Sequence, residues 1–287
     1  MSFEPRLMAV HAHPDDESSK GAATMAHYAT LGRVRVVTCT GGERGSILNP
    51  RLVGRADIEE NMHEVRVQEM ANAAEALGVE HHWLGFIDSG LPEGDPLPPL
   101  PEGSFATVPI EEPIERLVAQ IREFRPQVLT TYNELGGYPH PDHIRTHEIS
   151  IAAVKAAADP EQFPEAGEPW TVSKVYYDVG FNPERFKTLH ETLESAGIES
   201  PYRGWLDRRG RAPMRRVDAR IEIAKYFPQR DRALLAHATQ IDPEGMFMAV
   251  PRDIEAEVWP WEEFELAHSE VGMPDGIETD LFARIEE

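Results

Sequence analysis

Short apolar runs alternate with amphipathic stretches over the first 180 residues. The apolar runs have the length of strands and cover residues 7–11, 34–40, 79–87, 128–132 and 172–179. Stretches with helical periodicity lie between them, at residues 17–31, 58–77, 114–124 and 142–158. Strands that alternate with helices form parallel sheets through right-handed crossovers. The pattern therefore predicts an α/β fold, doubly wound around a mostly parallel, Rossmann-like sheet.

The last third of the chain is less regular. Apolar and polar residues alternate over 217–223, which is typical of a strand with one face in water, and Pro228 suits the first turn of a helix that reaches about residue 239. Three large aromatic residues in the tail indicate that it docks on the protein: Trp259, Trp261 and Phe264. We therefore predict an α/β metal-hydrolase core over residues 1–180 and an irregular C-terminal extension over 181–287, packed together as a single structural unit.

Composition excludes several classes of partner. The 287 residues carry a formal charge of −22, which repels phosphate backbones and anionic lipid, so we expect no nucleic acid and no membrane as partner. No apolar stretch approaches the roughly 18 residues of a membrane helix, and the N-terminus has no signal-peptide pattern. The single cysteine, Cys39, lies in an apolar run and is interpreted as a small buried hydrophobe, which favours a cytoplasmic location. Nothing in the sequence specifies an oligomeric state.

Charged side chains are concentrated where the first apolar run ends. His11, His13, Asp15, Asp16 and Glu17 fall within seven residues. Charges are rarely buried without partners, so this heptapeptide indicates a bound cation or a reaction. Imidazole and carboxylate groups together suit a divalent transition metal, with zinc as the first choice.

A second cluster follows the apolar run 128–132 and contains Tyr138, His140, Asp142, His143 and His147. The three histidines have helical i, i+3, i+7 spacing and can share one helix face. A catalytic zinc keeps three protein ligands and an open position. His13 and Asp16 are expected to supply two of them, and the spacing alone leaves the three histidines open as the third.

Both clusters directly follow predicted parallel strands, as do residues 41–45 and Asp88. The carboxyl ends of such strands share one edge of the sheet, where ligands bind. We therefore expect these segments to meet in one crevice. The proline-rich loop over 88–112 near the same edge is either a functional rim or a tolerated insertion.

The residue types suggest metal-assisted hydrolysis. With Asp16 on the metal, Asp15 can take a proton from water. We expect Asp142, just outside the ligand shell, to hold the His140 imidazole charged, so that it stabilises an oxyanion or protonates a leaving amine. The alternative for His140 and His147 is an ordinary surface or helix-capping histidine.

Two other classes of protein compete with the hydrolase. A dinucleotide-binding module would place its phosphate loop after the first strand, but that loop needs glycines and here contains Pro14, Asp15, Asp16 and Glu17. A non-catalytic metal-dependent binding module is the other alternative.

The motifs His13-Pro-Asp-Asp-Glu and His140-Pro-Asp-His, with residues 10–21, 40–45, 136–140 and 231–243, resemble the zinc-dependent N-deacetylases of the LmbE-like (PIG-L) family along essentially the whole chain. The resemblance implies one Zn²⁺ per chain, with Fe²⁺ as the alternative, held by His13, Asp16 and His143. It also implies that Asp15 is the general base and that Tyr138 and His140 stabilise the transition state.

The resemblance extends to substrate. It implies hydrolysis of the amide in small-molecule S-conjugates of mycothiol, with N-acetylglucosaminyl-inositol deacetylation as the alternative, and Lys20 favours the former. Arg66 and Asp88 would contact the sugar–inositol part. Lys20 lies one helical turn after Asp16 and can reach the pocket mouth, although a solvated lysine is the simpler interpretation. For Arg66 the simpler interpretation is an ion pair on its own helix, with Glu60, Glu64 or Glu69.

Overall fold

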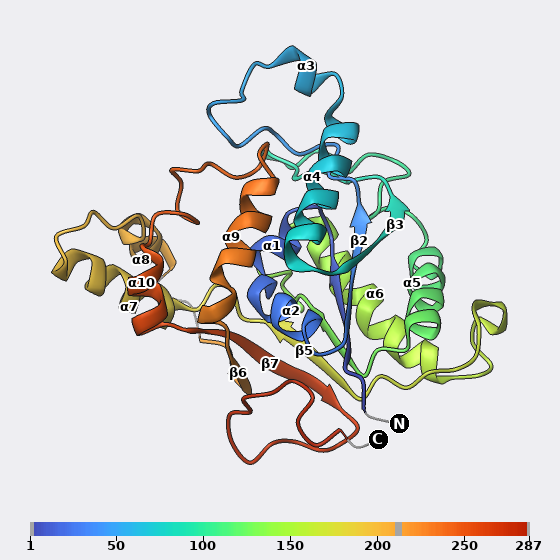
Figure 1. Cartoon of the computed structure of the whole chain (residues 1–287). Coiled ribbons are helices and arrows are strands. Elements are labelled where there is room, and N and C mark those ends of the chain that lie inside the picture. Colours follow the sequence, from blue (N-terminus) through green and yellow to red (C-terminus); the bar gives the residue numbers. More distant parts are fainter. Residues whose placement is uncertain (1–2, 210–213, 286–287) are drawn as a thin grey trace.

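The computed structural model describes residues 3–209 and 214–285. Within these ranges, seven strands form one sheet in the order β3-β2-β1-β4-β5-β7-β6 (Figure 1). Their bounds are β1 (Arg6–His11), β2 (Arg33–Thr40), β3 (Glu80–Phe86), β4 (Val128–Thr131), β5 (Lys174–Asp178), β6 (Ala219–Glu222) and β7 (Trp261–Ser269). Each strand that we expected is present, and the tail adds β7.

Strands β3, β2, β1, β4 and β5 are parallel, and β7 runs antiparallel to both β5 and β6. The central strand β1 pairs on both sides, with Ala9 opposite Val36 of β2 and Thr130 of β4. The order of the strands reverses between β1 and β4. In an open parallel sheet this reversal opens a crevice at the carboxyl ends of the two strands. The predicted doubly wound, mostly parallel α/β fold is confirmed.

Helices cover both faces of the sheet. The helices α2 (Ala22–Ala29), α4 (Met62–Leu77) and α9 (Phe227–Ala236) pack on one face with a core that includes Met70 and Phe264. On the other face, α5 (Glu111–Phe124) and α6 (Pro141–Ala158) pack with Leu129 and Val175. None of the helices in the described ranges is both long and apolar enough to cross a bilayer. Cys39 is buried, as expected.

A third apolar cluster lies beside the sheet, on the left in Figure 1. It joins α7 (Pro183–Ser195), α8 (Arg203–Arg209) and α10 (Arg252–Val258) through Phe186, Tyr202 and Val250. The remaining short helices are α1 (Asp16–Ser19), α3 (Ala56–Glu59) and two 3-10 turns, Pro164–Ala166 and Ala224–Tyr226. The predicted division at residue 180 falls between β5 and α7 and stays a prediction.

The single helix expected over residues 17–31 is wrong, because the chain leaves the helix at Lys20 and Gly21. Lys20 is extended, with φ −137° and ψ 111°, and Gly21 is left-handed, with φ +69°. A side chain at position 21 would be strained at this φ, and its Cβ would lie 2.9 Å from the Asp178 carboxylate. This break turns the Lys20 side chain towards the sheet edge.

Candidate metal centre and cavity

The segments that follow β1, β2, β3 and β4 meet at the carboxyl edge of the sheet, as the sequence predicts. Asp15 opens α1 with φ +122°, a conformation that is costly for any residue other than glycine. Asp16 follows immediately as the first residue of α1. Asp16 Oδ2 accepts hydrogen bonds from the His13 backbone N–H at 3.0 Å and from the Tyr132 hydroxyl at 2.6 Å.

Three donor atoms form a small triangle at this edge. His13 Nδ1 lies 3.3 Å from His143 Nε2 and 3.5 Å from Asp16 Oδ2, and the third side, from His143 Nε2 to Asp16 Oδ2, is 3.4 Å. All three residues are buried. Metal–ligand distances of about 2.0–2.1 Å in tetrahedral geometry require sides of about 3.3–3.4 Å. The donor set therefore fits one small divalent metal ion.

Hydrogen-bond partners outside the triangle engage the second nitrogen of each imidazole and so leave His13 Nδ1 and His143 Nε2 facing the centre of the triangle. His13 Nε2 lies 3.2 Å from Asp142 Oδ2, which also accepts a hydrogen bond from the Ser89 backbone N–H at 2.9 Å. His143 Nδ1 lies 2.9 Å from the Gly136 carbonyl oxygen, so it donates there. Such partners orient metal-binding imidazoles and fix their tautomers. Gly136 has φ +70°, and a Cβ there would lie 2.7 Å from the Cβ of His143.

A second group of possible ligands, His13, Asp88 and His140, shares His13 with the first. It would need His13 Nε2, which lies 3.6 Å from Asp88 Oδ1 but is already engaged by Asp142. His147 belongs to neither group among the described residues, and its Nδ1 lies 3.1 Å from the Tyr132 carbonyl oxygen. The geometry favours the triangle with His143.

Charge at the triangle also favours a cation. Burial alone would lower the pKa of His13, but hydrogen bonds with Asp142, Asp16 and Asp88 raise it well above its usual value. Burial would raise the pKa of Asp16, but the positive charge of Lys20 and the neighbouring imidazoles lower it well below its usual value. Carboxylates that stay ionised in a buried site suit a metal ion.

The expectation that Asp142 holds His140 charged is wrong. The Asp142 carboxylate faces His13, and it is the Asp142 backbone N–H that donates to His140 Nδ1, at 3.1 Å, capping α6. Burial and repulsion from His13 and His143 lower the pKa of His140 to about 4. The imidazole is therefore neutral near pH 7, with its remaining hydrogen on Nε2. It can still donate a hydrogen bond from that atom.

Arg66 is buried, with 2 % of its surface exposed, and its guanidinium joins two loops. It donates to the carbonyl oxygens of Gly42 at 2.7 Å and Pro14 at 2.8 Å, and it lies 3.5 Å from Asp15 Oδ2. A Cβ at Gly42, where φ is +64°, would meet Arg66 at 2.4 Å. These contacts replace the helical ion pair considered from the sequence.

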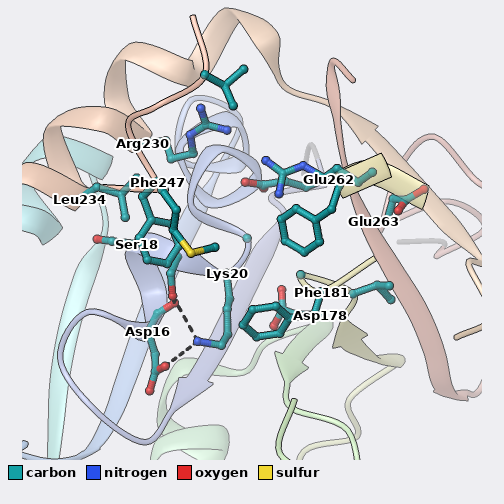
Figure 2. Close-up of a pocket in the computed structure, with 18 of the residues that line it drawn as sticks. Asp16, Ser18, Lys20, Asp178, Phe181, Arg230, Leu234, Phe247, Glu262 and Glu263 are labelled. Atoms are coloured by element: carbon teal, nitrogen blue, oxygen red, sulfur yellow. Dashed lines mark hydrogen bonds and ion pairs between the residues drawn. The ribbon is translucent and has the colours of Figure 1, made fainter. Parts of the chain in front are cut away.

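A cavity of about 250 Å³ opens beside the triangle. Asp15, Asp16, Lys20 and Tyr138 line one end of it. The Lys20 ammonium lies 2.6 Å from Asp16 Oδ1, as Figure 2 shows, so Lys20 is held in the site and is not a solvated lysine. Burial opposes its charge, but Asp16 outweighs this and raises the pKa of Lys20.

Asp88 is buried at the carboxyl end of β3 and is not part of the cavity wall found among the described residues. Its Oδ2 accepts from the Arg44 backbone N–H at 3.0 Å, and its Oδ1 accepts from the Gly90 backbone N–H at 2.7 Å. Within the same ranges, residues 92–101 also take no part in the wall, so the proline-rich loop is not a rim of this cavity.

Three residues support the site in ways that the sequence does not indicate: Tyr132, Glu17 and His237. The Tyr132 hydroxyl binds Asp16 and also accepts from the Ala12 backbone N–H at 2.8 Å. Buried Glu17 lies 2.7 Å from His237 Nε2, which ties the first loop to the end of α9. Tyr132 is the last residue of the strand predicted over 128–132, and this position at the carboxyl edge is the signal that the sequence offers for it. The contact between Glu17 and His237 spans 220 residues and leaves no local pattern.

Comparison with known proteins agrees with this architecture. Residues 8–154 match the family described as PIG-L, GlcNAc-PI de-N-acetylase. The chain belongs to this family. A mycothiol S-conjugate amidase of Streptomyces coelicolor is 58% identical over 100% of this chain and 99% of the relative. A 1D-myo-inositol 2-acetamido-2-deoxy-alpha-D-glucopyranoside deacetylase of Nocardioides is 39% identical over 99% of each chain.

The fold is also found among solved structures. N,N'-diacetylchitobiose deacetylase from Pyrococcus horikoshii superposes with a TM-score of 0.60, covering 91% of this chain and 83% of that one at 18% identity. At this identity the likeness concerns the fold alone.

Proposed function

We propose that this chain is a zinc-dependent amidase that hydrolyses the amide of mycothiol S-conjugates. The products are a mercapturic acid and glucosaminyl-inositol, so the reaction removes thiol-linked electrophiles. The 58% identity to a relative of that name over the full chain supports the substrate. The observation that carries the reaction class is the buried triangle of His13, Asp16 and His143 beside a cavity that Asp15 also lines.

In this proposal His13 Nδ1, Asp16 Oδ2 and His143 Nε2 hold the metal, zinc first and iron as the alternative. Bound there, a zinc ion would polarise the amide carbonyl and make water nucleophilic at neutral pH. Asp15 accepts the proton of the attacking water and later delivers it to the leaving amine. Burial and the Asp16 charge raise the pKa of Asp15 despite the opposing effect of Arg66, which suits a residue that exchanges protons.

Tyr138 and His140 stabilise the tetrahedral intermediate. The Tyr138 ring lies 4.6 Å from the His143 ring and 6.0 Å from the His140 ring, measured between centroids, so all three share one side of the site. Neutral His140 donates from Nε2 to the developing oxyanion. A hydrogen bond that strengthens as charge develops lowers the barrier to reaction.

Three further residues are proposed to help bind the substrate: Lys20, Arg66 and Asp88. Lys20 contacts it directly at the cavity wall, next to the metal ligand Asp16. The internal hydrogen bonds of Arg66 and Asp88 suggest that most of their effect is to shape the loops around the sugar–inositol part. A direct contact with the substrate would use those N–H groups of Arg66 and those acceptor positions of Asp88 that make no hydrogen bond within the protein.

Deacetylation of N-acetylglucosaminyl-inositol is the second candidate, favoured by the relatives that are 39% identical. The same donor triangle and base would serve it. The deciding experiment offers the zinc-loaded protein a bimane-labelled mycothiol conjugate and the N-acetyl sugar and compares kcat/KM, the quantity that measures discrimination. We expect a clear preference for the conjugate, and we expect Lys20→Ser to weaken conjugate hydrolysis more than deacetylation. A preference for the acetyl sugar would refute the amidase proposal.

A further inference from the structure

The cavity extends well beyond the groups that would act on an amide. At the end formed by segments after β5, the cavity is lined by charged side chains, among them Arg230 and Glu262, and by apolar side chains, which include Phe181, Phe186, Tyr202, Met246, Phe247 and Val250. These apolar residues lie in the loop after β5, in α7, near α8 and in the segment that precedes α10. Space of this kind is unnecessary for an acetyl group.

Two aromatic side chains at this end are left open to solvent. Phe181 is 37% exposed and Phe247 is 42% exposed. Figure 2 draws both side chains with Lys20, and all three line the same cavity. Large apolar groups that stay exposed around a concave surface are typical of a ligand site, because a bound apolar group removes them from water.

Charged residues that line the same cavity are joined to one another by hydrogen bonds. Arg185 of α7 donates to Glu255 of α10 at 2.8 Å, and Arg230 of α9 donates to both oxygens of the same carboxylate at 2.7 and 3.0 Å. Arg252 donates to Glu255 at 2.9 Å. Three helices are thereby joined through one buried carboxylate. These contacts restrict the movement of the three helices relative to one another, which reduces the cost of ordering this wall on binding.

We propose that this aromatic end of the cavity binds the thioether substituent of the conjugate and selects apolar, preferably aromatic, substituents. The inference rests on the proposed function. A scissile amide divides the substrate into a sugar–inositol side, rich in hydroxyls, and an acyl side that ends in the substituent. Hydroxyl groups buried without partners are costly, whereas an aromatic or alkyl group is favoured among phenylalanine and methionine side chains.

The test measures binding apart from catalysis. S-benzyl-N-acetylcysteine and S-methyl-N-acetylcysteine represent the acyl product with a large and a small substituent, and glucosaminyl-inositol represents the other product. Calorimetry on the zinc-loaded full chain would compare wild type, Phe247→Ala and Phe181→Ala. Leu97→Ala is the matched control, because Leu97 is 65% exposed in the proline-rich loop, away from the cavity wall.

We expect each phenylalanine variant to bind the benzyl compound about tenfold more weakly, and the methyl compound and glucosaminyl-inositol within twofold of wild type. Equal losses for the benzyl and methyl compounds would overturn the inference, as would no loss, or no binding of the benzyl compound to wild type at millimolar concentration. Weakened binding of glucosaminyl-inositol would instead place the sugar in this cavity. The proposed function is tested separately by turnover of the intact conjugate, so the two failures are distinguishable.

Discussion

Removal of the Tyr132 hydroxyl tests how the protein supports its candidate metal ligands. It donates to Asp16 Oδ2 at 2.6 Å and accepts from the Ala12 backbone N–H at 2.8 Å. Tyr132 is 2% exposed, so water cannot replace the hydroxyl without rearrangement. Tyr132→Phe removes one oxygen atom and leaves the shape of the ring unchanged.

The expected cost follows from the two lost hydrogen bonds. A hydrogen bond to a charged group contributes about 1.5–3 kcal/mol, and a buried donor left without a partner costs about 1–3 kcal/mol. Since the deleted phenol no longer needs to be desolvated, we expect the free energy of unfolding to fall by about 3 kcal/mol. Loss of a group that orients a metal ligand also weakens metal binding by about 10–100-fold.

Urea unfolding measures the first effect in protein treated with chelator, and a competition titration with a zinc-binding dye measures the second. Tyr177→Phe is the control. Tyr177 is half-buried on the neighbouring strand β5, and its hydroxyl makes none of the hydrogen bonds found among the described residues. We expect the control to change stability by less than about 0.5 kcal/mol. A loss below about 1 kcal/mol in metal-free Tyr132→Phe, with unchanged metal affinity, would show that this hydroxyl does not support Asp16.

Three further predictions follow from the same structure. Metal analysis by atomic emission should find His143→Ala depleted of metal and His147→Ala loaded, because His143 Nε2 lies beside His13 and Asp16 whereas His147 is in neither group of possible ligands among the described residues; the reverse pattern would refute the choice of the third ligand. Asp15→Asn should retain metal and lose turnover by a factor of about 10² to 10⁴, the usual contribution of general acid–base catalysis, and near-normal kcat would remove Asp15 from the mechanism. Despite burial, Arg230 and the other arginines lower the pKa of Glu255 to about 2 from 4.5. The stability this provides is present above pH 4.5 and lost as the pH falls towards 2. Glu255→Gln should flatten the acid limb of stability measured by thermal unfolding between these values, and an unchanged limb would contradict the assignment.

Much of the fold and the position of the site can be read along the chain. The alternation of apolar runs and amphipathic stretches predicts the parallel strands correctly, because a strand buried on both faces is apolar throughout. Since parallel strands share one edge, residues 13–16 and 140–143 are expected together although more than 120 positions separate them. The sequence thus determined the parallel part of the sheet, its carboxyl edge and the chemical types of the donors.

The tertiary structure alone decided which atoms face one another. Among the described residues, His143 Nε2, and not a nitrogen of His147, adjoins His13 and Asp16. The Nδ1 atom of each ring faces a backbone carbonyl oxygen, of Gly136 for His143 and of Tyr132 for His147. Local spacing constrains which helix face a residue occupies, but ring rotation depends on partners that are distant in sequence. The charge of His140 was mispredicted for the same reason, since the adjacent Asp142 carboxylate is turned to His13. The cavity likewise joins the first loop to segments beyond residue 178, and such long-range packing has no periodic signature in the chain.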